Sequence, residues 1–348
     1  MSHRSIEAPP PRVLGGLRGH HGAAAGPAAS LPAAPEAAPP APGPLELICQ
    51  RPRALLQRRF LSSEECRRLI DMTLGRQRCG SVFEKKARSP LEVSDPRWDP
   101  EQRAFLERIE ARLAAIMGGP VHADEDALVG TLTPPGGEES IADHLGLHVD
   151  TNAAPWRFCT AIIYAPGACA AGSIAASAVK GPRAGAGPAG LSSVQRGGET
   201  VFPVALRPGA ARGEEAPGLA AAAQELLDLG VDHTDKAKVG QGGPAAAAAA
   251  QRLLAAARRT DAGVRVAPEE GTVCVFWTRL DDGEVDCHSW HAGAPVPKGD
   301  NWKWTLQKFK EVPMSVRSSS AALADFVRGT RHLATAAVAG EAAGSPDG

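Results

Sequence analysis

The helical periodicity of this chain stops at Gly118, and a different pattern begins there. Before that point, apolar residues three or four apart indicate helices over about 62–75 and 100–117. A Gly-Gly-Pro sequence ends the second helix. Beyond it, short apolar segments such as ALVGTLT, RFCTAIIYA and TVCVFWTRL alternate with Gly, Pro and Asp. This pattern predicts a mainly β fold with flanking helices, built as a β-sandwich or barrel.

Much of the chain is too poor in large apolar side chains to build a core. Ala, Pro and Gly dominate residues 1–44, and Ala/Gly-rich insertions occupy about 165–195 and 208–263, the second with helices over about 217–228 and 244–259. Such segments bury too little apolar surface to offset the entropy lost on ordering. The expected divisions are a disordered segment (1–44), a helical support region (45–120), one β domain with both insertions (121–312) and a partly helical tail (313–348).

Composition excludes several classes of protein. The net charge is -1, the charges are mixed and there is one Tyr, so we do not expect nucleic-acid binding. No run of about 18 apolar residues is present, so we expect no membrane span. The seven cysteines are odd in number and contain no CxxC pair, which favours small core residues in a reducing compartment over disulfides.

The N-terminal segment leaves two interpretations open. It lacks the apolar region of a secretory signal. Arg4, Arg12 and Arg18, with Glu7 as the one acidic residue before Glu36, permit an organelle transit peptide. Pro-rich low complexity explains the same residues as a disordered tail, which we favour. The expected protein is soluble and intracellular, either cytoplasmic or organellar.

The first candidate metal ligands are His148 and Asp150 in the sequence HVD. In an extended strand, residues two apart project from the same side, so this imidazole and carboxylate lie together. They supply two of the three ligands of the facial triad that leaves open positions on iron(II). Taken alone, the short HVD pattern fits a solvated turn between strands as well.

Two later motifs extend this site. His291 in SWHAG is a candidate third ligand that only folding can bring to HVD. The neighbouring His144 and His288 are alternatives, but we favour supporting or surface roles for them, because only HVD places a carboxylate beside an imidazole. Lys303, on a predicted strand, offers the fixed cation that a dicarboxylate co-substrate needs, although a lysine on a strand is usually solvated.

The order of the motifs resembles that of the prolyl 4-hydroxylase branch of the iron(II)- and 2-oxoglutarate-dependent dioxygenases. The resemblance spans roughly 45–165, 194–207 and 264–312. The motifs that carry it are FLSSEEC (60–66), HVD with RFCTAIIY (157–164), GGETVFP (197–203), PEEGTVCVFW (268–277) and HAGAPVPKG (291–299). An ordered series is more specific than any one motif. The resemblance implies a double-stranded β-helix, which is a jelly roll of cupin-like form.

The resemblance also implies residue roles. These are metal binding for His148, Asp150 and His291, cofactor binding for Lys303, Thr200 and Tyr164, and substrate binding for Arg157. For Arg157, a structural ion pair is an equal alternative. In the family the lysine lies ten residues after the distal histidine, where this chain has Asn301, so Lys303 requires a two-residue insertion in the preceding turn. Gly146 replaces a tyrosine that is common in the family, which puts family-like peptide recognition in doubt.

The implied activity is that of a 2-oxoglutarate-dependent dioxygenase, a hydroxylase like procollagen-proline 4-dioxygenase. It would use Fe²⁺, dioxygen and 2-oxoglutarate, release succinate and carbon dioxide, and rely on ascorbate to keep the iron reduced. The favoured substrate is a prolyl residue in a peptide or protein, Pro-rich ones included. The alternatives are a free amino acid or small metabolite as substrate, a non-catalytic β-barrel binding module, and a cupin-like hydrolase with zinc or another metal.

Overall fold

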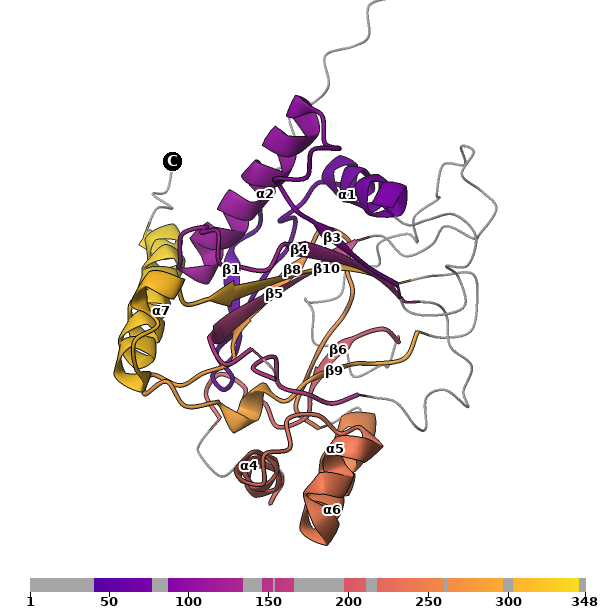
Figure 1. Ribbon diagram of the computed structural model, residues 1–348, viewed down its shortest axis with the longest axis vertical. Coiled ribbons are helices and arrows are strands. Elements are labelled where there is room, and N and C mark those ends of the chain that lie inside the picture. Colours follow the sequence, from indigo (N-terminus) through magenta and orange to yellow (C-terminus); the bar gives the residue numbers. More distant parts are fainter. Residues whose placement is uncertain are drawn as a thin grey trace, which may run out of the picture. The chain divides into compact units, whose positions relative to one another are not determined.

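The central element of the fold is a seven-stranded antiparallel sheet (Figure 1). The computed structural model describes residues 41–76, 87–133, 146–152, 154–165, 197–210, 218–259, 262–296 and 303–343. The sheet has the strand order β1-β2-β8-β5-β10-β4-β3. Its strands are β1 (Leu45–Cys49), β2 (Ala54–Gln57), β3 (Ala87–Leu91), β4 (Leu128–Thr133), β5 (Arg157–Ala165), β8 (Val273–Trp277) and β10 (Lys303–Glu311).

Some of the sequence-based predictions fall on residues outside this description. They concern the N-terminal segment up to residue 40, the Ala/Gly-rich tract at 166–196, His144 and Asn301. The elements described here all belong to one compact unit, Pro40–Gly348. The division into a disordered segment, a support region, a β domain and a tail therefore stays a prediction.

A second, smaller antiparallel sheet faces the first. It has the order β7-β6-β9, formed by β6 (Thr200–Phe202), β7 (Val264–Val266) and β9 (Ala292–Gly293). Apolar side chains from both sheets pack together between them, including Ile162 and Phe276 from the large sheet and Phe202 from the small one. Two facing antiparallel sheets with helices outside confirm the predicted mainly β fold and are consistent with a jelly roll.

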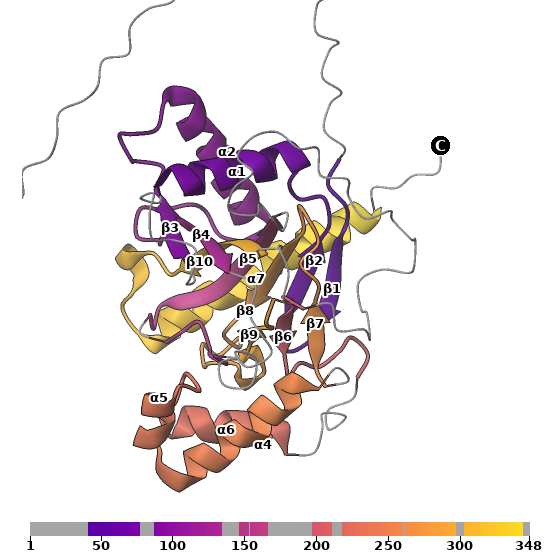
Figure 2. The same ribbon diagram turned by 90° about the vertical axis from the view of Figure 1, so that its right-hand side faces the viewer.

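Three helices cover the outer face of the large sheet: α1 (Ser63–Arg76), α2 (Pro100–Met117) and α7 (Ser320–Ala343) (Figures 1 and 2). Leu69, Ile109 and Val327, one from each helix, join the apolar cluster on that face. Helix α2 begins at a capping box between Asp99 and Gln102 and ends at Gly118, whose left-handed backbone has φ 75°. The predicted helices over about 62–75 and 100–117 are confirmed.

Three further helices lie between β6 and β7 in the sequence: α4 (Leu219–Asp228), α5 (Lys236–Gln241) and α6 (Gly243–Arg258). They lie on the side of the small sheet away from the large one (Figure 1), where Leu226 and Leu253 pack with Val201. Two of them confirm predicted helices, whereas the short α5 was not predicted. Two 3-10 turns, Cys287–Ser289 and Met314–Val316, complete the described elements.

The interior contains the described cysteines as free, buried thiols, which confirms the prediction for Cys49, Cys66, Cys159, Cys274 and Cys287. Burial raises the pKa of the Cys49 thiol to about 12, so this thiol stays protonated at neutral pH. Among the described helices, none combines the length and the apolar character that crossing a bilayer requires.

Candidate metal centre

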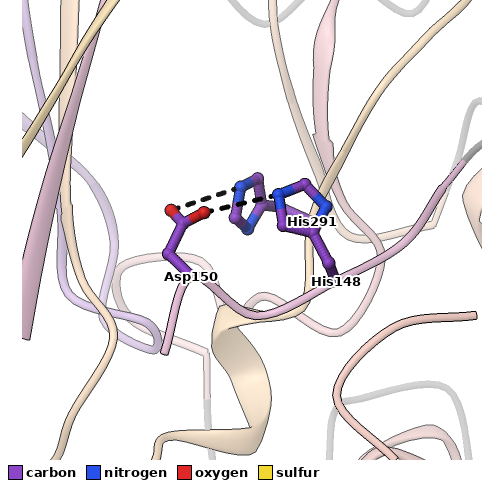
Figure 3. A group of neighbouring side chains, drawn as sticks. All are labelled: His148, Asp150 and His291. Atoms are coloured by element: carbon purple, nitrogen blue, oxygen red, sulfur yellow. Dashed lines mark ion pairs between the residues drawn. The ribbon is translucent and has the colours of Figure 1, made fainter. Parts of the chain in front are cut away.

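Three side chains from two distant segments converge at the inner face of the small sheet. His148 and Asp150 come from the HVD segment and His291 comes from the residue before β9 (Figure 3). His148 Nε2 lies 3.3 Å from Asp150 Oδ1, and His291 Nε2 lies 3.5 Å from Asp150 Oδ2. The three candidate ligand atoms all lie within 4.8 Å of one another. The fold thus brings together the three residues that the sequence selected.

Backbone pairing explains why the two imidazoles are neighbours. His148 and His291 exchange both of their N–H···O=C hydrogen bonds at 3.0 Å, so they are directly opposite each other on adjacent segments. The Nδ1 of each ring bonds a backbone carbonyl, that of Gly146 at 2.8 Å or that of Ser289 at 2.9 Å. Each Nδ1–H therefore donates to a carbonyl, and each Nε2 faces Asp150, where it can donate to the carboxylate when the ring is protonated and offer a lone pair to a metal when the ring is neutral.

Alternation along the HVD segment places the residue between the ligands on the other side. Val149 is fully buried and packs with Leu147 and Leu226 beneath helix α4. This contact anchors the segment, because moving Val149 would open the apolar cluster under the small sheet. The two ligands project together into the space between the sheets, as the strand period of two predicts.

The Asp150 carboxylate is buried and negatively charged. Burial alone would raise its pKa, but His291, His148 and a hydrogen bond from Thr160 outweigh burial and hold the pKa well below its usual range. Thr160 Oγ1 donates to Asp150 Oδ2 at 2.7 Å. Sequence reasoning missed this threonine, although it lies on the predicted strand after HVD. Two neutral imidazoles and one carboxylate form a donor set that fits iron(II) and other divalent first-row metals.

A second polar group lies between the sheets, formed by the three residues predicted to bind 2-oxoglutarate. Tyr164 Oη donates a hydrogen bond to Thr200 Oγ1 at 2.7 Å. Lys303 Nζ lies 5.8 Å from the centroid of the Tyr164 ring. Its side chain passes Gly198 and Gly293, where added Cβ atoms would lie 3.4 Å from Cδ and 3.7 Å from Nζ. Both distances are ordinary van der Waals contacts, so the lysine packs along these two glycines, and the structure brings all three predicted residues together.

Arg157 is engaged elsewhere. Its guanidinium pairs with Asp126 and with Glu311, the latter at 3.3 Å, and lies 4.1 Å from the centroid of the Phe309 ring. Its Nη1 also donates to the carbonyl oxygen of Asp150 at 3.4 Å. These contacts match the ion-pair alternative and connect Arg157 to the metal segment through the backbone.

Of the two alternative histidines, only His288 is described, and it does not join the three candidate ligands. It is buried, which rules out the surface role and leaves the supporting role of the two that the sequence allowed, and its Nδ1 lies 3.1 Å from Asp286 Oδ1. Asp286 in turn pairs with Arg51 at 2.9 Å. A residue that the sequence did not select, His233, lies beside His148 instead, with 5.8 Å between the ring centroids.

Comparison with known proteins supports the resemblance seen in the motifs. No family model matches the chain. The chain is 24% identical to probable prolyl 4-hydroxylase 10 of Arabidopsis thaliana over 269 residues, which covers 75% of this chain and 70% of that protein. It is also 24% identical to prolyl 4-hydroxylase 5 of Arabidopsis thaliana over 271 residues, which covers 75% of this chain and 69% of that protein.

A solved structure that matches is viral collagen prolyl hydroxylase vCPH from Paramecium bursaria Chlorella virus-1 in its 2OG complex. The match has a TM-score of 0.37 and 15% identity, and it covers 75% of this chain and 96% of that one. A truncated form of the viral enzyme matches with a TM-score of 0.38 and 15% identity, over 77% of this chain and 94% of that one. The two plant relatives, both named prolyl 4-hydroxylases, support a prolyl 4-hydroxylase-like enzyme.

Proposed function

We propose that this protein is an iron(II)- and 2-oxoglutarate-dependent dioxygenase that hydroxylates a prolyl residue in a peptide or protein. The observation that carries the proposal is the convergence of His148, Asp150 and His291 at one site between the two sheets, in a fold that also places Lys303 against the buried Tyr164. The prolyl substrate rests on the two plant relatives, which are named prolyl 4-hydroxylases. Fold alone would not select a substrate.

The three converging residues would hold the metal through two Nε2 atoms and one carboxylate. Bound iron(II) supplies the dioxygen chemistry that converts 2-oxoglutarate to succinate and carbon dioxide and hydroxylates the substrate. Ascorbate would keep the iron reduced. The protein's own contribution is to fix the imidazoles through their Nδ1 hydrogen bonds, to orient the Asp150 carboxylate through Thr160, and to surround the site with apolar side chains such as Phe202 and Phe276.

Lys303 and Thr200 would hold the distal carboxylate of 2-oxoglutarate, while Tyr164 would line the pocket and orient Thr200. The Lys303 ammonium supplies the charge that a partly desolvated carboxylate requires. Burial raises the pKa of Tyr164 well above its ordinary value, so its hydroxyl keeps its proton and remains a donor. Thr200 accepts the hydrogen bond from Tyr164 and keeps its own hydroxyl hydrogen available for a ligand oxygen.

The decisive experiment is a succinate-release assay on the purified protein with iron(II), ascorbate and Pro-rich peptides. We expect succinate release that depends on 2-oxoglutarate and peptide, and addition of one oxygen atom to a prolyl residue by mass spectrometry. Asp150→Ala should abolish turnover, while manganese or zinc should occupy the same site without supporting it. His288→Ala should keep the metal, and loss of metal in this variant but not in His148→Ala would reassign the ligands.

The same assay distinguishes the alternatives. Turnover with free proline or a small metabolite but with no peptide would identify a small-molecule dioxygenase. Hydrolysis without 2-oxoglutarate would identify a cupin-like hydrolase. Peptide binding without any turnover in the iron-loaded protein would identify a non-catalytic binding module.

A further inference from the structure

A short segment of the helical insertion lies directly beside the proposed metal ligands. Between α4 and α5, residues 231–234 run antiparallel to the HVD segment. Val149 N–H donates to the carbonyl oxygen of Asp232 at 3.1 Å, and Thr234 N–H donates to that of Leu147 at 2.8 Å. The insertion thus continues the small sheet past His148, on the side opposite His291.

The hydrogen-bond pattern sets His233 against His148. Both hydrogen bonds join the residues that flank the two histidines, and none joins His148 to His233. The two histidines therefore form a non-hydrogen-bonded pair, in which side chains lie closer together than in a hydrogen-bonded pair. The two rings stack with an interplanar angle of 27° and centroids 5.8 Å apart. Because His291 pairs with His148 on its other side, the three imidazoles form a row on one face of the small sheet.

His233 is a neighbour of the ligand group rather than a part of it. Among the described residues, two groups have ligand atoms within 4.8 Å of one another, one formed by His148, Asp150 and His291 and the other by Asp286, Cys287 and His288, and neither contains His233. The side chains of His233 and His148 keep 31% and 30% of their surface exposed, whereas that of His291 keeps 5%. The row of imidazoles therefore reaches solvent at its His148 and His233 end.

The hydrogen-bonding groups of His233 remain available for a ligand. Its Nδ1 accepts the Asp235 N–H at 2.9 Å and lies 3.1 Å from Asp235 Oδ2, so Asp235 fixes the ring. In the neutral tautomer in which Nδ1 accepts, the ring hydrogen is on Nε2. In a non-hydrogen-bonded pair the backbone N–H and C=O point away from the partner strand. Within the described part of the chain, neither that N–H nor Nε2 has a hydrogen-bond partner. His233 thus presents two donors.

Two donors match the chemistry of a proline-containing peptide. A prolyl residue has no N–H, so the peptide around it is rich in carbonyl acceptors and poor in donors. Extended or polyproline segments leave those carbonyls without internal hydrogen bonds. We propose that His233 is a substrate-binding residue that hydrogen-bonds a backbone carbonyl of the peptide and so sets its position beside His148. This inference rests on the proposed function.

The test compares His233→Phe, His233→Gln and the control Lys236→Ala, whose exposed side chain lies on the adjacent helix α5. Phe keeps a ring against His148 but loses the imidazole donor, whereas Gln keeps an N–H donor. The probe is a synthetic (Ala-Pro)5 peptide in the succinate-release assay on the full-length, iron-loaded protein. We expect His233→Phe to raise the KM for the peptide about tenfold, which is about 1.4 kcal/mol. The KM for 2-oxoglutarate should move much less, and Gln should restore most of the peptide affinity.

Each other outcome overturns a specific statement. If circular dichroism shows that His233→Phe is folded and its KM for the peptide is unchanged, His233 does not contact the substrate. Loss of bound iron in His233→Gln, restored in His233→Phe, would show that the ring merely supports His148. If wild-type protein hydroxylates no peptide at all, the proposed function itself fails, and this is distinguishable because it appears before any substitution is made.

Discussion

Tyr164 and Thr200 link the two sheets through one buried hydrogen bond, 2.7 Å from Tyr164 Oη to Thr200 Oγ1. Tyr164 lies on β5 of the large sheet and Thr200 begins β6 of the small one. Tyr164→Phe keeps the ring but removes the donor, so we expect it to destabilise the protein by about 1 kcal/mol in urea unfolding. The double-mutant cycle with Thr200→Val should show coupling, and additive effects would mean that the bond contributes nothing.

Tyr164 also gives a pH-dependent signal that no other side chain obscures, because it is the single tyrosine of the chain. Burial raises the pKa of Tyr164 well above 10.0, so tyrosinate absorbance should stay absent from the folded protein at a pH where the unfolded chain already ionises. Because the pKa of Tyr164 is higher in the folded protein than in the unfolded chain, the protonated hydroxyl contributes its full stabilisation below the unfolded pKa of about 10. That stabilisation is lost as the pH rises through the pKa of the folded state. If Tyr164 ionised at the same pH in the folded and the unfolded protein, the burial of its hydroxyl would be contradicted.

Thr160 should matter to metal binding more than its size suggests. Its hydroxyl bonds the Asp150 carboxylate, and Thr160→Val removes that bond at nearly constant volume. We expect iron(II) affinity to fall about 10- to 100-fold, as for other residues that orient a metal ligand. Thr278→Val is the matched control, because Thr278 is equally buried and its hydroxyl has no hydrogen-bond partner among the described residues. If Thr160→Val and Thr278→Val bound iron(II) with equal affinity, Thr160 would have no role in metal binding.

Lys303 is the proposed anchor for the distal carboxylate of 2-oxoglutarate. Lys303→Ala should raise the KM for 2-oxoglutarate about tenfold or more, since a partly desolvated carboxylate left without a cation costs several kcal/mol. Asn301→Ala should have a much smaller effect, because an amide offers no charge. Lys236→Ala controls for the loss of a lysine as such. An unchanged KM in Lys303→Ala would place the anchor on another residue and reopen the dependence on 2-oxoglutarate.

Local patterns predicted the elements that local forces determine. Helix α2 could be predicted because its apolar stripe, its capping box and its terminal Gly118 all lie within its own sequence. The shared direction of His148 and Asp150 followed from the period of a strand. The short helix α5 was missed because it has no buried residue and hence no apolar stripe to detect.

Long-range pairing is what the sequence could not supply. His233 lies beside His148 because the insertion returns to the edge of the small sheet, and nothing in the residues around His233 records that return. The sequence left the position of His288 open for a related reason: its Nδ1 lies 3.1 Å from Asp286, which pairs with Arg51, 235 residues away in the sequence. The choice between two roles for Arg157 likewise depended on acids that are distant in sequence.

Arg157 provides the last test, because its two interpretations predict opposite results. Its guanidinium contacts Asp126, Glu311 and the Phe309 ring, and it keeps 18% of its side-chain surface exposed. If these contacts define its role, Arg157→Ala should destabilise the protein by about 1–3 kcal/mol, because Asp126 loses its arginine partner and Glu311 keeps only Arg317.

In that case the KM for the (Ala-Pro)5 peptide should change little. The control is Arg97→Ala, an exposed arginine whose carboxylate partner, Asp95, lies two residues away. Its removal should cost at most about 1 kcal/mol. A substrate-binding Arg157 would instead raise the peptide KM about tenfold while the unfolding free energy stayed near that of wild type. Arg157 also donates to the carbonyl oxygen of Asp150, so Arg157→Ala is expected to weaken iron binding as well if both roles apply. Arg157→Lys keeps the charge but loses the guanidinium geometry. If that geometry holds the metal segment, Arg157→Lys should weaken iron binding as much as Arg157→Ala does.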